Sequence, residues 1–195
     1  EMSTQLNHLA VENFAKIAKA SNIKLIHIST DYVFDGTNHI PYTERDKTNP
    51  QSVYGSTKLA GEQALHHINP SNSIIIRTSW VYSSFGNNFV KTMLRLANER
   101  TELGVIVDQI GTPTYARDLA KVLLNIIPKL NNENVEVYHF SNKGVSSWYD
   151  FAKAIFEVSN LILVFFSANL TNCSVTFISP KLSILSKSTD FLGIN

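Results

Sequence analysis

Apolar residues recur every three to four positions along residues 3–20, a period that predicts an amphipathic helix. The next apolar run, residues 24–30, is short and is followed by an Asp-Gly turn signal, which is typical of a strand. The same alternation continues along the chain. We expect further helices at 52–68, 88–100, 116–130 and 147–158, and further strands at 73–82, 104–109 and 136–141.

Strands that alternate with helices of about 10–15 residues predict parallel βαβ units, and hence an α/β sheet with helices on both faces. Ligands of such sheets bind beyond the carboxyl ends of the strands. Two expected strand ends carry hydroxyl and aromatic side chains there, at residues 29–32 and 78–82. These two segments are the first candidates for a binding site.

Glycine is scarce in this chain, with 8 glycines among 195 residues. No three of them have the spacing of a G-x-G-x-x-G turn or of a P-loop, so the sequence excludes a self-contained nucleotide-phosphate site of either kind. The formal net charge is +1 and no basic run is present, so we expect no nucleic-acid partner.

The remaining sequence features set broad limits on location and ligands. The single Cys173 cannot form an internal disulfide and the first residues show no signal-peptide pattern, so we expect a cytoplasmic location. The most apolar run, residues 161–166, is far shorter than the roughly 18 residues of a membrane span, so we expect no membrane partner. His66 and His67 are adjacent and point to different helix faces, and we expect no metal site.

Tyr54 and Lys58 lie four residues apart at the start of an expected helix, so their side chains share a face. A cation one turn away lowers the pKa of a tyrosine, which would tune Tyr54 for protonating an alkoxide. Thr30, at an expected strand end, could hydrogen-bond the same oxygen. The spacing alone is a weak signal, because Tyr149 and Lys153 repeat it in a segment that we interpret as a helix capping box.

Longer motifs resemble a known family. Residues 29–36, 41–44, 49–50 and 54–62 resemble the extended short-chain dehydrogenase/reductases. Within that group, residues 77–82, 86–90, 108–114, 138–142 and 147–152 resemble the dTDP-4-dehydrorhamnose reductase family. The resemblance runs from about residue 3 to residue 158, with the motifs in the family's order.

The resemblance implies an oxidoreductase that uses NADP or NAD to reduce the 4-keto group of a dTDP-6-deoxyhexose, giving dTDP-L-rhamnose. It implies that Tyr54 donates the proton and that Thr30 hydrogen-bonds the carbonyl. Lys58 would hold the nicotinamide ribose together with Tyr54 and would lower the pKa of Tyr54. The residues implied to contact the substrate are Thr30, Asp31, Trp80 and Asn88.

The resemblance also implies the architecture and the partners. We expect an incomplete Rossmann-like parallel sheet with helices on both faces, plus a small C-terminal substrate-binding region. Residues 1–82 would be the C-terminal part of the nucleotide-binding domain. Residues 83–195 would be mainly the substrate-binding region, in which residues 159–179 are atypical of the family. The expected partner is a dTDP-sugar, and a homodimer is a possible assembly.

One departure from the family leaves alternatives open. Chains of the family begin with a βαβ unit whose glycine turn holds the cofactor pyrophosphate at a helix N-terminus. This chain lacks that unit, so we expect an N-terminally truncated relative. The alternatives are a non-catalytic regulatory or binding module of the same family, or an inactive fragment without the cofactor phosphate loop.

Overall fold

The computed structural model describes residues 1–160 and, as a strand, residues 164–168. The longer helices are α2 (Ala10–Ser21), α3 (Val53–Ile68), α4 (Phe89–Glu99), α5 (Ala116–Ile126) and α6 (Trp148–Val158). The shorter helical segments are α1 (Met2–Thr4), the π-helical η1 (Gln5–Leu9), and the 3-10 turns η2 (Asp31–Val33) and η3 (Ile127–Lys129). The strands are β1 (Leu25–Thr30), β2 (Ser73–Thr78), β3 (Val81–Tyr82), β4 (Glu102–Ile106), β5 (Ile110–Gly111), β6 (Thr114–Tyr115), β7 (Glu136–His139), β8 (Ser146–Ser147) and β9 (Val164–Ala168).

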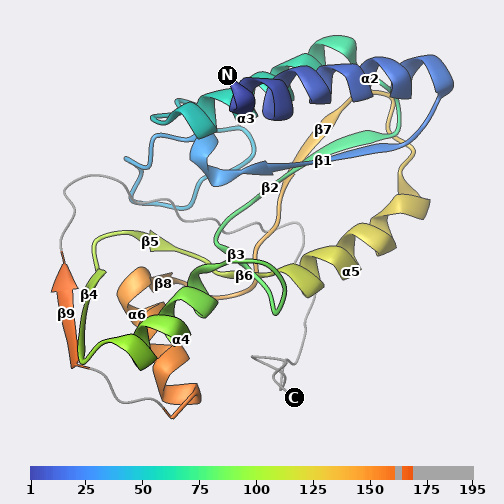
Figure 1. Cartoon of the computed structure of the whole chain (residues 1–195). Coiled ribbons are helices and arrows are strands. Elements are labelled where there is room, and N and C mark those ends of the chain that lie inside the picture. The colour runs from blue at the N-terminus through green and yellow to red at the C-terminus, as the bar shows by residue number, and fades with distance from the viewer. Residues whose placement is uncertain (161–163, 169–195) are drawn as a thin grey trace.

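A parallel sheet with the strand order β1-β2-β7 forms the centre of the fold (Figure 1). Leu25 pairs with Ser73 and Thr30 pairs with Thr78, so β1 and β2 end at the same level. Every residue of β2 is buried, as expected for a central parallel strand that is covered on both faces.

Alternate residues of β2 face opposite sides of this sheet. Ile75 packs beneath α2 and α3, in a core that includes Val11 and Leu65. Ile74 and Ile76 face the other side, where they pack against α5. Figure 1 shows α2 and α3 along one face and α5 along the other. The expected α/β fold, with helices on both faces of a parallel sheet, is confirmed.

A second hydrophobic core lies between α4, α6 and β4, in the part of the molecule drawn below the sheet in Figure 1. Short strand pairs surround it: β3 with β6 and β4 with β9 in parallel, and β5 with β8 antiparallel. The buried members of this core are Tyr82, Val90, Met93, Leu103, Val105, Phe151, Ala152, Ile155 and Phe156.

The expected strand at 73–82 is wrong in one respect, because it is broken into β2 and β3. Trp80 has a φ of 48°, a left-handed conformation that a continuous strand cannot contain. The strand expected at 104–109 is β4, which begins two residues earlier and ends three residues earlier than expected. The helix expected at 116–130 ends at Ile126, and η3 with Pro128 follows.

The proposed division of the chain after residue 82 stays a prediction. β7 and α5 belong to the second part by residue number, yet both pack in the central sheet layer. Of the atypical stretch 159–179, residues 161–163 and 169–179 lie outside the described residues. Among the helices of residues 1–160, none is both long enough and apolar enough to cross a membrane.

Candidate active site

Thr30 and Asp31 lie where β1 ends and η2 begins. The Thr30 hydroxyl caps η2, since it accepts a hydrogen bond from the backbone N–H of Tyr32 at 3.2 Å. The same hydroxyl donates to Oδ1 of Asp31 at 2.9 Å. Both side chains are buried, and Asp31 is only 2% exposed. Strand and turn together therefore hold a hydroxyl and a carboxyl at the carboxyl end of the sheet, as expected from the sequence.

Tyr54 and Lys58 lie on one face of the first turns of α3. The helix cap and the close contact of α3 with η2 position both side chains. The hydroxyl of Ser52 accepts a hydrogen bond from the N–H of Gly55 at 3.0 Å and so starts the helix. The rings of Tyr54 and Tyr32 meet edge to face, with their centroids 5.9 Å apart. The start of α3 thus lies directly against η2, which brings Tyr54 to Thr30 and Asp31.

Gly55 permits this close approach, and replacing it should weaken the site. A Cβ at this position would lie 2.2 Å from the backbone oxygen of Tyr32, so Gly55→Ala must push α3 away from η2. We expect a loss of about 1–3 kcal/mol in the free energy of unfolding, measured by chemical denaturation. Gly104→Ala is the matched control, because its added Cβ meets nothing within 4 Å. Equal losses in the two variants would contradict the close approach.

The electrostatic environment of Tyr54 differs from the expected one. Burial and the negative charge of Asp31 raise the pKa of Tyr54, and a hydrogen bond with Thr30 acts in the opposite direction. The Lys58 ammonium donates instead to the backbone oxygen of Ile28, at 2.6 Å. Burial lowers the pKa of Lys58. Burial therefore dominates the pKa of Tyr54 in this structure, and the lowering of that pKa by Lys58 that the resemblance implies stays a prediction.

Burial raises the pKa of Asp31 to about 7. Its hydrogen bonds to Thr30 and to backbone N–H groups favour the charged form and oppose this rise. A carboxyl group with such a pKa carries its proton for part of the time at neutral pH. Asp31 can therefore donate as well as accept a hydrogen bond where it faces a ligand.

We expect Asp31→Asn to change the way stability depends on pH. The folded state holds the pKa of Asp31 at about 7, above the ordinary value of 3.8, so ionisation disfavours folding. The wild type should therefore lose stability relative to the variant as the pH rises from about 4 to about 7, and the difference should stay constant above that. Chemical denaturation of both proteins across this range measures it. A difference that is independent of pH would contradict the buried carboxyl.

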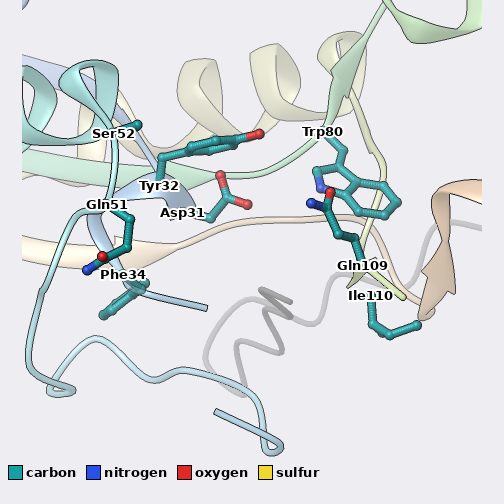
Figure 2. A pocket seen from close by; sticks show the side chains of 8 residues that line it. All are labelled: Asp31, Tyr32, Phe34, Gln51, Ser52, Trp80, Gln109 and Ile110. Atoms are coloured by element: carbon teal, nitrogen blue, oxygen red, sulfur yellow. The ribbon is translucent and has the colours of Figure 1, made fainter. Parts of the chain in front are cut away.

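A pocket opens beside these residues, between η2 and the segments around Trp80 and Gln109 (Figure 2). Its volume is about 170 Å³. Figure 2 shows Asp31 and Tyr32 on one side and Trp80 with Gln109 on the other. The lining residues are Asp31, Tyr32, Phe34, Gln51, Ser52, Trp80, Gln109 and Ile110.

The structure thus places two of the residues implied to contact the substrate, Asp31 and Trp80, in the wall of one pocket. Tyr32, a third lining residue, belongs to the segment 29–32 that the sequence marked as a candidate binding site, and sequence reasoning assigned no individual role to the others. Residues 108–114 carried a family motif, and this was the one signal that pointed to Gln109 and Ile110.

Trp80 forms its wall of the pocket at some conformational cost. Its left-handed backbone costs roughly 1–2 kcal/mol in a residue other than glycine. Two hydrogen bonds hold the segment between β2 and β3: Ser79 Oγ donates to the backbone oxygen of Thr112 at 2.8 Å, and the Thr114 N–H donates to the backbone oxygen of Trp80 at 3.1 Å. A strained residue that its neighbours fix is typical of a functional position.

Asn88 has a structural role in this arrangement. Its Oδ1 accepts a hydrogen bond from the N–H of Lys91 at 3.2 Å and thereby caps α4. Its Nδ2 donates to the backbone oxygen of Ser83 at 2.6 Å. Asn88 is not among the residues that line the pocket, so the contact with a sugar-nucleotide implied for it stays a prediction.

A buried ion pair between β2 and α3 lies next to the site. Arg77 of β2 donates three hydrogen bonds to Glu62 of α3, from Nη2 to Oε2 at 2.7 Å and from Nε to Oε1 at 3.0 Å and to Oε2 at 3.3 Å. The Arg77 guanidinium also lies over the ring of Phe34, 5.1 Å from its centroid. This ion pair ties α3, which carries Tyr54, to the strand beside β1.

Two buried histidines lie in the same sheet. Burial lowers the pKa of His27 and of His139 to about 4, so both are neutral at pH 7. Within residues 1–160, no group of three or more histidine, cysteine, aspartate or glutamate side chains has the arrangement of a metal site.

Comparison with known proteins shows the family of this chain. Residues 1–174 match the model of the RmlD substrate binding domain. The chain belongs to this family. The match to the RmlD substrate binding domain extends beyond residue 158, where the motifs quoted from the sequence end. The expected membership of the reductase family is thereby confirmed.

Individual proteins named dTDP-4-dehydrorhamnose reductase are also similar to this chain. The chain is 45% identical over 181 residues to the dTDP-4-dehydrorhamnose reductase of Aggregatibacter actinomycetemcomitans, which covers 91% of this chain and 61% of that protein. It is 44% identical over 182 residues to the dTDP-4-dehydrorhamnose reductase of Escherichia coli, covering 92% of this chain and 60% of the relative. The chain therefore spans about three fifths of the length of these curated relatives.

A solved structure supports the fold. The crystal structure of dTDP-4-dehydrorhamnose reductase from Bacillus anthracis, in complex with NADP, matches with a TM-score of 0.82 and 38% identity. The match covers 89% of this chain and 63% of that chain. The Rossmann-like character expected of the α/β fold agrees with this neighbour.

Proposed function

We propose that this chain carries the catalytic and substrate-binding part of an NAD(P)H-dependent reductase. The reaction is reduction of the 4-keto group of a dTDP-6-deoxy-4-ketohexose to form dTDP-L-rhamnose. The observation that carries the proposal is the placement of Tyr54 against η2, where Thr30 and Asp31 end β1, beside a pocket lined by Asp31 and Trp80. A cytoplasmic location suits this activity, and a homodimer stays a prediction.

The residues present fit the nicotinamide ribose end of the cofactor. Lys58 is half-buried on α3 one turn from Tyr54, and an ammonium group has three donors. One donor binds the backbone oxygen of Ile28, which leaves two for ribose hydroxyls. Tyr54 and Lys58 would hold this end of the cofactor, which supplies a hydride to the substrate when it is bound.

The proton transfer follows from the state of Tyr54. Its raised pKa keeps the phenol protonated at neutral pH, which is the form that a proton donor needs. As the carbonyl carbon accepts the hydride, Tyr54 donates its proton to the carbonyl oxygen and the product is an alcohol. Thr30 hydrogen-bonds the same oxygen while charge develops on it. The Lys58 cation stabilises the phenolate that remains.

The pocket walls suit the sugar. Asp31 offers a carboxyl group that both donates and accepts hydrogen bonds near neutral pH, which matches sugar hydroxyls. Trp80 offers an indole surface opposite to it (Figure 2), and apolar faces of sugar rings pack on such surfaces. These two residues would orient the ring so that its keto group meets Tyr54.

The test uses a chimera in which this chain replaces the matched part of the Escherichia coli relative. We expect the chimera to oxidise NADPH only when the dTDP-linked 4-keto sugar is present. A chimera that binds NADPH and the sugar-nucleotide but shows no turnover would favour the regulatory module. A chimera that is folded but binds neither would favour an inactive fragment.

A further inference from the structure

The side of the pocket opposite Asp31 is built from residues far apart in the sequence. The indole of Trp148, the first residue of α6, stacks on that of Trp80 with ring centroids 3.6 Å apart and planes 13° apart. A Cβ at Gly111 would lie 2.5 Å from Cε2 and Cζ2 of Trp80, so the indole edge lies directly on the Gly111 backbone. Trp80 is therefore fixed both on a ring face and along an edge.

Gln109 connects this stack to the pocket. Its Oε1 accepts a hydrogen bond from Nε1 of Trp148 at 3.1 Å. An indole N–H can only donate a hydrogen bond, so the amide oxygen of Gln109, and not its nitrogen, must face Trp148. The nitrogen end of Gln109 is then directed to the pocket, across from Asp31 and Tyr32 (Figure 2).

We propose that Gln109 is a specificity residue whose amide N–H groups donate to an oxygen of the bound sugar, and that its hydrogen bond with Trp148 has a positioning role, because it orients both Gln109 and the stack of Trp148 on Trp80. This inference rests on the proposed function, because it takes the ligand to be a sugar-nucleotide. This side of the pocket then presents the amide donor of Gln109 beside the apolar indole face of Trp80. Asp31 supplies the complementary carboxyl from the other side of the pocket.

The cap of α6 holds Trp148, the first residue of that helix, in place. Ser147 and Asp150 form a capping box, in which Ser147 Oγ accepts from the Asp150 N–H at 2.9 Å and the Ser147 N–H donates to Oδ2 of Asp150 at 3.1 Å. Phe89 packs against Trp148, with centroids 4.5 Å apart. The first turn of α6 is thus a rigid support for the pocket wall.

The positioning role is tested on this chain without a ligand. Trp80 and Trp148 are the two tryptophans of the sequence, and indoles stacked this closely couple their electronic transitions into a paired circular-dichroism band. We expect Gln109→Leu to weaken this band, because Trp148 loses its acceptor. Gln109→Glu should keep the band, because an oxygen still accepts from Trp148. Gln63→Leu, at an exposed position of α3, is the control that should leave the band unchanged. An unchanged band in Gln109→Leu would overturn the positioning role.

The donor role is tested by calorimetry on the chimera, with dTDP-L-rhamnose and dTDP as probes. We expect Gln109→Glu and Gln109→Leu to weaken binding of dTDP-L-rhamnose at least roughly tenfold and to leave binding of dTDP unchanged, because only the sugar meets the amide. Equal affinity of Gln109→Glu and wild type for dTDP-L-rhamnose would overturn the inference. If the wild-type chimera bound neither probe and showed no turnover, the proposed function itself would fail, which is a different result.

Discussion

Tyr54→Phe should reduce the turnover of the chimera by about a hundredfold to ten-thousandfold, because general-acid catalysis contributes on that scale. The change removes one oxygen from a half-exposed ring and keeps the ring contact with Tyr32. Binding of NADPH should change little, since the Lys58 ammonium keeps its position through its hydrogen bond to the backbone oxygen of Ile28 in β1. The measurement is kcat from NADPH oxidation, together with a fluorescence titration of NADPH.

Tyr149→Phe is the matched control for this variant. Tyr149 also precedes a lysine by four residues, but Lys153 is exposed and pairs with Glu157 at 3.8 Å. We expect Tyr149→Phe to leave kcat within about twofold of the wild type. Turnover of Tyr54→Phe at the wild-type rate would show that another group donates the proton.

Glu62→Gln should cost about 3–5 kcal/mol of stability, because it leaves the Arg77 guanidinium without its counter-charge in a buried site. The Glu62 side chain is 2% exposed and that of Arg77 is 6% exposed, so water cannot replace the lost partner. A loss of this size is a large share of the roughly 5–15 kcal/mol that stabilises a typical domain. Chemical denaturation at neutral pH gives the free energy of unfolding.

The exposed ion pair between Arg95 and Glu99 provides the control. Its nitrogen and oxygen are 2.6 Å apart, but the side chains are 59% and 51% exposed. Glu99→Gln should therefore cost less than about 1 kcal/mol. The double variant Glu62→Leu with Arg77→Met should be more stable than Glu62→Gln, since no unpaired charge remains. Equal losses in Glu62→Gln and Glu99→Gln would contradict the view that burial determines the effect.

Signals within a few residues of each other were sufficient to predict the main elements. Ser52 caps α3, and the segment at Ser147 and Asp150 forms the capping box that the sequence indicated. Asn22 and Asn69 end their helices in left-handed conformations. Such caps involve neighbouring residues only, so a single sequence contains the whole interaction.

Features that depend on distant partners were not predicted. Lys58 binds the backbone oxygen of Ile28, thirty residues away, and the spacing of Tyr54 and Lys58 gave no sign of this contact. Ser79 donates to the backbone oxygen of Thr112, and the indole of Trp80 stacks on that of Trp148, although the sequence does not place these partners side by side. Periodicity reports which face a residue occupies and not which side chain from another element will meet it.

The candidate site shows the same limit. The resemblance identified Thr30, Asp31, Tyr54 and Trp80, and the structure gathers Thr30 and Asp31 with Tyr54 and places Asp31 and Trp80 in one pocket. Sequence reasoning did not single out Gln109, because the role proposed for it depends on a hydrogen bond to Trp148, 39 residues away. Sequence reasoning selected residues that the structure brings together at the end of β1, and it selected few of the residues that line the pocket beside them.

The most direct measurement of the proposed activity is to follow the hydride itself. The chimera is incubated with the dTDP-linked 4-keto sugar and NADPH that carries deuterium at the transferable position, and the product is analysed by NMR. We predict dTDP-L-rhamnose with deuterium at C4 of the sugar, and its loss in Tyr54→Phe. A folded chimera that binds both ligands yet yields no C4-deuterated sugar would contradict the assignment of this chain as the catalytic part of the reductase.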